Sequence, residues 1–359
     1  MLDKYAGSAA AFSLRELTDT WVGKPVVNVE RGGPNSGIAD FTAEEIIDGT
    51  LSDWVDAGGS STGDGTIRIW YDQSGNGFDI SFLTSSSQQP KIISNGSNLL
   101  VNSNPTVKFD GTNYLFNSNS LSYDGGVSWY AVIKSLNNAA QRIWGDDIVG
   151  VQGNCVFLTN GTAEDYRIND NGNGYNQLSF TGETPFQQIR SFHFDESNGN
   201  YEYAFDGSNT TGTAPGWTGP IAPSGSTNVG VGGAGNGGQY LNGDIQELII
   251  YPNNMNSYRT GIEENISEVY SNPIISTNTI DEFPNTAAAY SLRELTDTWS
   301  GQPVISVRRG GDNAISDFTA EEITNGTIIT WSSAGDGNAY VTIWKDQSGN
   351  SFDISQSDP

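Results

Sequence analysis

Carboxylates are the residues of this chain with the clearest capacity for chemistry, because the sequence has 42 Asp and Glu residues but one His and one Cys. Two carboxylates that face one glycosidic bond, about 5 Å apart or wider, are the usual machinery for its hydrolysis. None of the candidates has a diagnostic spacing, and adjacent residues of a strand point to opposite faces. We therefore expect solvated surface groups and assign no catalytic residue among Asp146, Asp147, Glu164, Asp165, Asp195, Glu196, Glu202, Asp244 and Glu247.

Aromatic side chains offer a second kind of chemistry, because an exposed ring stacks on a sugar while Asn, Asp or Gln side chains pair with its hydroxyls. Trp217 follows Pro215 and Gly216 in a loop-like stretch, so we expect it to be exposed. Trp129 and Trp144 are open to a second interpretation, as core residues of strands. The candidate carbohydrate-binding residues are Trp217, Tyr175, Tyr166 and Trp144, with Trp129 as a further ring.

A metal site is the third candidate. Ca²⁺ takes oxygen ligands from loops, and the stretch 169–174 contains Asp170, Asn171 and Asn173. It lacks the full twelve-residue calcium-loop pattern, so an ordinary turn is the alternative. Ca²⁺ is thus the one cofactor that the sequence leaves open. His193 lies between two phenylalanines and Cys155 in an apolar run, so we expect both to be structural.

One stretch occurs twice and organises the chain around these candidates. Residues 67–81 alternate apolar and polar side chains and then turn at Asp72, Gln73, Ser74 and Gly75; residues 341–355 repeat the pattern. Because Asp in a turn can bond its own backbone amides, we expect a structural role. The second copy of the turn motif is Asp346, Gln347, Ser348 and Gly349.

The elements around the repeat also occur twice. Ser8–Leu17 reads as a short helix with apolar Phe12, Leu14 and Leu17. Thr42 with Glu45 three residues later forms a capping box, which returns 277 residues on at Thr319, since 319 − 42 = 277. Residues 90–272 consist of short strands broken by Gly and Asn turns, with a helix near 258–270.

These patterns predict an all-β fold with short peripheral helices and a partial second copy of its N-terminal module. We place an N-terminal module at 1–89, a β-sandwich at 90–272 that forms one fold with it, a linker at 273–284 and the partial repeat at 285–359. Strands at this spacing are typical of a two-sheet sandwich.

Composition restricts the partners. The chain carries 16 Lys and Arg residues and a net charge of −26. Nucleic acid and anionic membranes would repel it, so we expect neither as a partner. The sequence shows no signal-peptide pattern after Met1 and no run of about 18 apolar residues, so we expect no membrane insertion.

A family resemblance rests on the repeated opening. Residues 291–318, followed by 342–355, resemble the opening of the α-L-arabinofuranosidase B catalytic domain. The same opening is similar to modules of bacteriophage and marine bacterial surface proteins, in which a concanavalin A-like or laminin-G-like jelly roll follows. Phe109–Leu115 and Leu241–Tyr270 look like that sandwich. No segment matches the catalytic carboxylates of the arabinofuranosidases, and a single Cys cannot form their disulfides.

The resemblance implies a virion or cell-surface structural protein, a fibre or decoration component whose lectin-like sandwich binds glycans for attachment. Its partners would be other structural subunits of the same assembly and a polysaccharide, at the virion surface or otherwise at a cell surface or in the extracellular space. One alternative is an arabinofuranosidase-like hydrolase, so enzymatic activity stays open, with the weight against it. The other is a pure assembly module without ligand.

Overall fold

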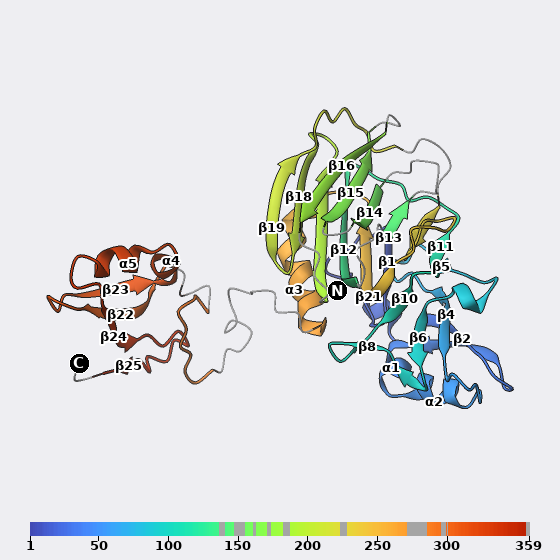
Figure 1. Ribbon diagram of the computed structural model, residues 1–359, viewed down its shortest axis with the longest axis horizontal. Coiled ribbons are helices and arrows are strands. Elements are labelled where there is room, and N and C mark those ends of the chain that lie inside the picture. The colour runs from blue at the N-terminus through green and yellow to red at the C-terminus, as the bar shows by residue number, and fades with distance from the viewer. Residues whose placement is uncertain are drawn as a thin grey trace. The chain divides into compact units, whose positions relative to one another are not determined.

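The computed structural model describes residues 1–135, 141–146, 155–160, 163–170, 174–181, 187–222, 228–270, 286–295, 299 and 301–356. The chain forms two compact units, Met1–Ile274 and Ile275–Pro359. The predicted linker at 273–284 lies outside the described residues. Each unit is described by itself below (Figure 1).

The first sheet of unit 1 is built around a strand that is apolar on both faces, β12 (Gly126–Ser135). Its Val127, Trp129 and Ala131 contribute to the core between the sheets, whereas Tyr130 and Val132 face outward. Strand neighbours pair antiparallel on both sides of β12, in the order β19 (Ser208–Thr213), β18 (Asn200–Phe205), β17 (Gln188–Asp195), β12, β21 (Asn242–Tyr251).

The second sheet covers the inner face of the first. Its aromatic residues meet those of the first sheet: the Tyr166 ring centroid lies 4.8 Å from that of Phe192, and the Phe157 ring centroid lies 4.4 Å from that of Trp129. The strands pair in the order β16 (Tyr175–Thr181), β15 (Ala163–Asn169), β14 (Cys155–Asn160), β13 (Gln141–Asp146), β20 (Val229–Val231), β11 (Leu115–Asn117), β5 (Ile80–Ser81).

One long helix covers the outer face of the first sheet. Helix α3 (Arg259–Tyr270) follows the 3-10 turn η3 (Asn256–Tyr258) and buries Ile262, Ile266 and Tyr270. These side chains form a second core with Tyr130 and Ile249 of the sheet. The first sheet is therefore covered on both faces over part of its area, which explains why β12 and β21 are apolar on both sides.

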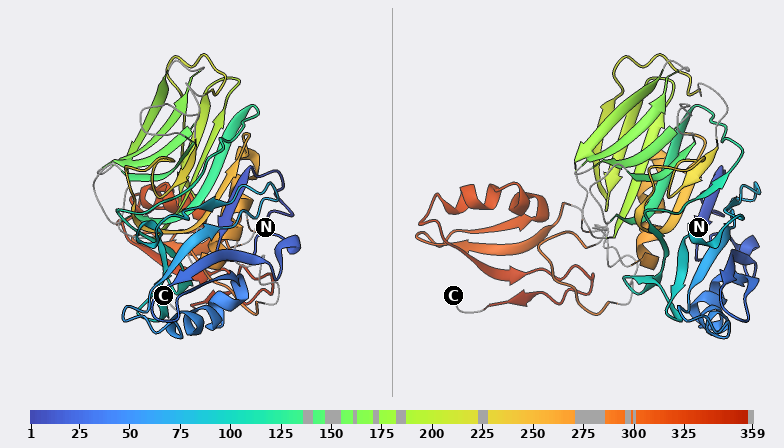
Figure 2. Two further views of the ribbon diagram at one scale, coloured as in Figure 1. Left: turned by 90° about the vertical axis from the view of Figure 1, so that its right-hand side faces the viewer. Right: turned by 45° about the vertical axis from the view of Figure 1, so that its right-hand side comes forward.

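The N-terminal module joins the sandwich through shared strands. Its own elements are β2 (Pro25–Arg31), β3 (Gly37–Thr42), α1 (Ala43–Ile47), α2 (Thr50–Asp56) and β4 (Gly65–Trp70), with the 3-10 turns η1 (Asp19–Trp21) and η2 (Ser86–Gln88). Strand β4 pairs with β2, β5 and β6 (Lys91–Ser94), and β6 pairs with β10 (Val107–Asp110), which lies beside β21. The small strands β7 (Ser97–Asn98), β8 (Leu100–Val101) and β9 (Asn104–Pro105) complete it. Most of the module, blue in Figure 2, lies at one end of the green strands.

The predicted helix at Ser8–Leu17 is wrong. Ala10–Ser13 forms strand β1, which pairs antiparallel with Ile250 to Glu247 of β21. The buried carboxylate of Glu247 fixes this edge: its Oε2 lies 2.8 Å from Nε of Arg15 and accepts a hydrogen bond from the Ser13 hydroxyl. A long-range strand partner has overridden a local helical pattern.

The turn at Asp72–Gly75 holds β1 from its other side. Asp72 Oδ1 accepts hydrogen bonds from the backbone N–H groups of Ala11 and Ser74, both at 2.9 Å. The Gln73 amide accepts from the Leu17 N–H and donates to the Ser13 and Arg15 carbonyls. Gly75 takes a positive φ of 89° that a side chain would strain. The side chains of Asp72 and Gln73 are both buried, and both form hydrogen bonds with the backbone of the opening segment.

Unit 2 repeats the module. It contains β22 (Pro303–Arg309), β23 (Ile315–Thr319), α4 (Ala320–Thr324), α5 (Thr327–Ser332), β24 (Ala339–Trp344) and β25 (Ile354–Ser355), in the sheet order β23, β22, β24, β25. Both capping boxes form. The hydroxyl oxygens of Thr42 and Thr319 each accept a hydrogen bond from the backbone N–H of the Glu three residues later, and the backbone N–H of each Thr donates one to the carboxylate of that Glu. The prediction of an all-β jelly-roll sandwich with short peripheral helices and a partial second copy is thus confirmed. No helix in the described part of the chain is long and apolar enough to cross a membrane.

We expect Gln73→Ala to destabilise unit 1 by about 3 kcal/mol, because it strands the buried Leu17 N–H and two carbonyls without a partner. The shift of the unfolding midpoint in urea measures this. Thr84→Ala, at an exposed position, is the control and should change little. Equal midpoints for the two variants would show that the turn does not stabilise β1.

Acid should weaken unit 2 through Asp346. Burial alone would raise the pKa of this carboxyl, but N–H donors from Ala289, Ser348 and Phe352 outweigh it and lower the pKa to about 2. Because the folded pKa lies below the unfolded value of about 3.9, its contribution is present above about pH 4 and is lost as the pH falls toward 2.

Hydrogen exchange of the β22 amides at pH 5 and pH 2.5, corrected for the intrinsic rate, tests this expectation. The loss of protection at pH 2.5 should be smaller in Asp346→Asn, which starts from lower stability, than in the parent chain. Glu321→Gln at an exposed site is the control. A parent-like acid loss in Asp346→Asn would contradict the assignment.

Candidate functional site

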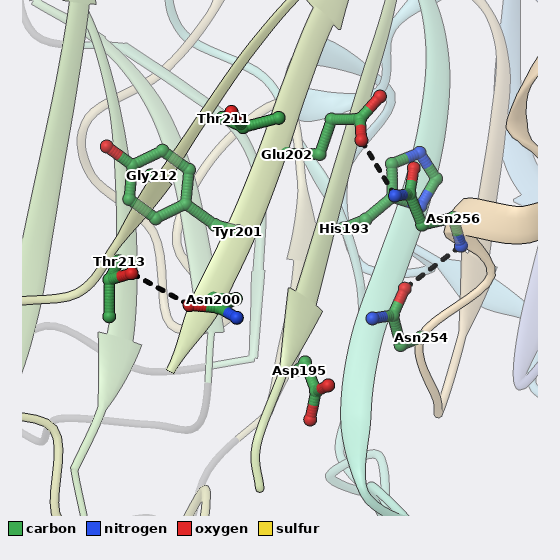
Figure 3. A pocket seen from close by; sticks show the side chains of 10 residues that line it. All are labelled: His193, Asp195, Asn200, Tyr201, Glu202, Thr211, Gly212, Thr213, Asn254 and Asn256. Carbon is green, nitrogen blue, oxygen red and sulfur yellow. Dashed lines mark hydrogen bonds between the residues drawn. The ribbon is translucent and has the colours of Figure 1, made fainter. Parts of the chain in front are cut away.

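A polar pocket lies on the outer face of the first sheet, between β17, β18, β19 and the loop that leads into α3 (Figure 3). Its volume is about 470 Å³, within the range of small-molecule sites. Most of the side chains at its walls carry amide, hydroxyl or carboxylate groups. The lining residues are His193, Asp195, Asn200, Tyr201, Glu202, Thr211, Gly212, Thr213, Asn254 and Asn256.

Strand register places the lining groups in two cross-strand rows. His193 of β17 pairs with Glu202 of β18, which pairs with Thr211 of β19. Asn200 pairs with Thr213, whose hydroxyl donates to the Asn200 side chain at 2.7 Å. Side chains of paired residues share one face of a sheet, so the register alone gathers these groups on the outer face, where Figure 3 shows them.

Glu202 is fixed in the pocket wall by three partners. Its Oε1 lies 2.8 Å from Nε of Arg259 and accepts a hydrogen bond from Asn209 at 2.9 Å. Its Oε2 accepts one from Asn256 at 2.7 Å. Arg259 also contacts Glu263 at 2.8 Å, one turn later on α3. The carboxylate is thereby oriented before any ligand arrives.

His193 forms the buried base of the pocket. Its Nδ1 lies 3.0 Å from the Ser128 hydroxyl, which in turn accepts the Met255 N–H. Burial, with the charge of Arg259, lowers the pKa of His193 to about 3, so the imidazole is neutral at neutral pH. Its Nε2 has no hydrogen-bond partner among the described residues. The sequence prediction of a structural histidine agrees with its burial, and the pocket lies directly above it.

Asp195, the second carboxylate of the pocket, holds its own turn. It accepts hydrogen bonds from the N–H and hydroxyl of Ser197 and from the Asn198 amide. The Ser197 hydroxyl is the largest cause of the lowered pKa of this carboxyl. A glycosidase acid must hold a proton near neutral pH, and Asp195 is tuned in the opposite direction.

Two predicted sugar platforms are wrong, because both rings lie on the second sheet and are buried in the core between the two sheets. Trp144 lies on β13 and Tyr166 on β15, and both rings are inside the sandwich core. Tyr166 lies amid Trp129, Phe157 and Phe192, and its hydroxyl donates to Glu164. Neither ring presents a face to a ligand.

The other two predicted platforms are half-buried and are not among the pocket-lining residues. Trp217 packs edge-on against Phe194 at 4.7 Å and donates its indole N–H to the Glu196 carbonyl at 2.8 Å. Tyr175 begins β16 on the second sheet. The structure therefore does not bring the four predicted aromatic residues together in one site.

The predicted calcium ligands are described only in part. Asp170 accepts hydrogen bonds from the N–H and hydroxyl of Thr218, the latter at 2.8 Å, so its carboxylate fastens the loop that carries Trp217. Asn171 and Asn173 lie outside the described residues. Among the described residues, no group of three His, Cys, Asp or Glu side chains is placed to hold a metal ion.

Other predicted carboxylates have structural partners. Glu164 lies 2.7 Å from Arg190 in the core and accepts the hydroxyls of Tyr166 and Tyr203. Glu247 is paired with Arg15 under α3. Asp147 lies outside the described residues, and Cys155 is a buried free thiol.

Sequence reasoning named Asp195 and Glu202 but missed the neutral lining groups. Asn200, Thr211, Asn254 and Asn256 are residues of common types in turns and edge strands. Strand register places Asn200 and Thr211 on one face, whereas Asn254 and Asn256 reach the pocket from the segment between β21 and α3.

The fold of this chain matches solved structures at low sequence identity. No family model and no curated protein matches it. An arabinofuranosidase complexed with arabinofuranosyl-α-1,2-xylobiose matches with a TM-score of 0.55 and 14% identity, over 72% of this chain and 62% of that one. A GH54 α-L-arabinofuranosidase soaked with a cyclic sulfate inhibitor gives 0.52 and 14%, over 85% and 68%. At this identity the likeness shows the fold alone.

Lowering the pH should destabilise unit 1 through His193. Because its folded pKa of about 3 lies below the unfolded value of about 6.5, the unfolded state binds the proton first, and stability is lost as the pH falls below about 6.5. At pH 5 the loss is about 2 kcal/mol. Chemical unfolding of the parent and of His193→Gln at pH 7 and pH 5 isolates this contribution, which the variant should lack. The same pH dependence in both chains would refute it.

Proposed function

We propose that unit 1 is a lectin-like β-sandwich that binds glycans in the outer-face pocket. The observation that carries the proposal is the pocket itself, in which exposed Asn and Thr groups surround a carboxylate that is already oriented by Arg259 and Asn256. A sugar presents a dense set of hydroxyls, and each needs a donor or an acceptor when it leaves water. A preoriented acceptor lowers the ordering cost of binding.

The pocket chemistry favours a neutral glycan. Oxygen acceptors at its wall include Glu202 and Asp195, while Arg259 is already engaged by Glu202 and Glu263. An anionic sugar would meet these carboxylates as well as a chain of net charge −26. Hydroxyl groups, in contrast, can donate to the carboxylates and accept from Asn200, Thr211 and Asn254.

Hydrolysis is the alternative from another class of function. It is supported by the titles of the matching structures, which describe arabinofuranosidases, one of them with a bound arabinofuranosyl xylobiose. Against it stand the two carboxylates of the pocket, because Asp195 has a lowered pKa and Glu202 is held by Arg259. Binding without turnover is therefore the function that we propose.

For the whole chain we propose a structural role at a virion or cell surface, as part of a fibre or decoration. The repeated module, the acidic composition and the similarity of its opening to surface-protein modules support this role. Other subunits of the same assembly and a polysaccharide would be its partners, outside the cell. Ca²⁺ at the Asp170 loop is proposed only as an accessory ligand.

A glycan array probed with the full chain tests the proposal, with arabinofuranosyl-substituted xylo-oligosaccharides among the neutral glycans. We expect binding to neutral glycans and about a tenfold or greater loss in Thr211→Phe, whose ring would fill the pocket. Thr210→Phe is the matched control, because it lies on the same exposed strand but points to the other face.

Three outcomes decide between the functions. Binding lost in Thr211→Phe and kept in Thr210→Phe, without hydrolysis, supports the lectin-like function. Release of arabinose that Glu202→Gln abolishes would replace it with a hydrolase. No binding to any glycan on the array would leave the pure assembly role as the better account.

A further inference from the structure

The two copies of the module have the same internal structure. In each copy the turn aspartate accepts a backbone N–H from the opening segment, Ala11 to Asp72 at 2.9 Å and Ala289 to Asp346 at 2.8 Å. The side-chain oxygen of Gln347 accepts a hydrogen bond from the Leu295 N–H at 2.8 Å, and that of Gln73 accepts one from the Leu17 N–H at 2.9 Å. A difference in exposure between the copies therefore reports their surroundings.

One face of the module is covered in unit 1 and bare in unit 2. Trp70 and Ile80 are fully buried against the sandwich, whereas their counterparts Trp344 and Ile354 are 38% and 54% exposed. Leu14 and Ile67 are buried and their counterparts exposed in the same way. We call the exposed set in unit 2 the bare face: Leu292, Val341, Trp344 and Ile354.

The largest differences lie on that face, although Ile46 and Leu51 are also more deeply buried than their counterparts Ile323 and Ile328. Ile38 and its counterpart Ile315 are exposed in both copies, at 53% and 68%. The internal core is buried in both, as Phe41 and Phe318 show. The bare face is thus the surface that meets a sandwich in unit 1, and scattered exposed residues elsewhere do not explain it.

The backbone of the opening segment gives a second, independent indication. Ala10–Ser13 forms β1 because β21 pairs with it, whereas the equivalent residues 288–291 form no strand and have no strand partner in the described part of the chain. Arg15 reaches Glu247 of β21, and the exposed Arg293 stands at the corresponding position. The bare face, the backbone edge of residues 288–291 and the Arg293 cation of unit 2 together correspond to the groups that meet the edge of a sandwich sheet in unit 1.

We infer that the bare face of unit 2 is a docking surface for a second β-sandwich of the kind formed by residues 90–251, with an acidic residue at the position of Glu247. The sandwich in unit 1 is not the occupant, because β1 and β10 already pair with β21 along that edge. The occupant adds a strand to residues 288–291, covers the four apolar side chains and pairs its acid with Arg293. This surface is separate from the glycan pocket.

The chain's own sandwich serves as the probe. Residues 86–274 are appended after Pro359, which aligns with Ser85 because 344 − 70 = 274 and 359 − 274 = 85. Ile354→Cys places a thiol on the bare face, and Ile315→Cys is the matched control at a site exposed in both copies. Both are made in a Cys155→Ala background. We expect the appended sandwich to slow alkylation at position 354 by about tenfold or more, since reaction then needs local opening, and to leave position 315 unchanged.

Arg293→Glu in the extended chain checks the mode of docking. It should restore fast alkylation at position 354, because the introduced carboxylate would repel the Glu247 carboxylate of the appended copy. Protection that survives Arg293→Glu would overturn the inference, as would equal alkylation at 354 with and without a folded appended sandwich. The parent chain alone gives a further check. Slow alkylation at 354 together with a dimeric mass would show that two copies of unit 2 cover each other, which also overturns it.

Discussion

The structure depends on one set of hydrogen bonds, in which the side chains of Asp72 and Gln73 bind the backbone of the opening segment. Both side chains are buried, so each bond replaces a partner that water would otherwise supply. The bonds use one edge of the segment and leave the other for β21, which converts Ala10–Ser13 into a strand. Through this strand the small module and the large sandwich become one unit. The same bonds recur at Asp346 and Gln347, where the opening segment has no sandwich strand beside it among the described residues.

The site follows from the way the sandwich is covered. Helix α3 packs on only part of the outer face of the first sheet. His193 and Glu202 lie beside the start of α3, where the outer face is no longer covered by the helix. The charged residues of α3 then orient the pocket: Arg259 holds Glu202, and Glu263 holds Arg259. A preformed polar hollow beside a packed helix is a geometry suited to recognising hydroxyl groups.

Local signals in the sequence predicted what local interactions determine. The Thr42–Glu45 box, the strand alternation of β4 and the repeated turn all depend on residues close in sequence, and the structure contains them. The segment Ser8–Leu17 was predicted as a helix because its decisive partner, Glu247, is more than 200 residues away. Trp144 and Tyr166 were predicted as platforms because strand alternation does not say which face of their sheet the other sheet will cover. The pocket's neutral residues carry no local signal, since the pairing of β17, β18 and β19 and the segment that leads into α3 bring them together.

In this account, the turn at Asp72–Gly75 binds one edge of the opening segment, and a strand of a sandwich sheet pairs with the other edge. Residue-resolved hydrogen exchange of the full chain tests this claim most directly, by comparing amides of 10–13 with those of 288–291. The amides of Ala11 and Ala289 should exchange slowly in both copies, because Asp72 and Asp346 accept them. The other amides should be protected in β1 and should exchange fast in 288–291. Equal protection of the two segments throughout would contradict the account.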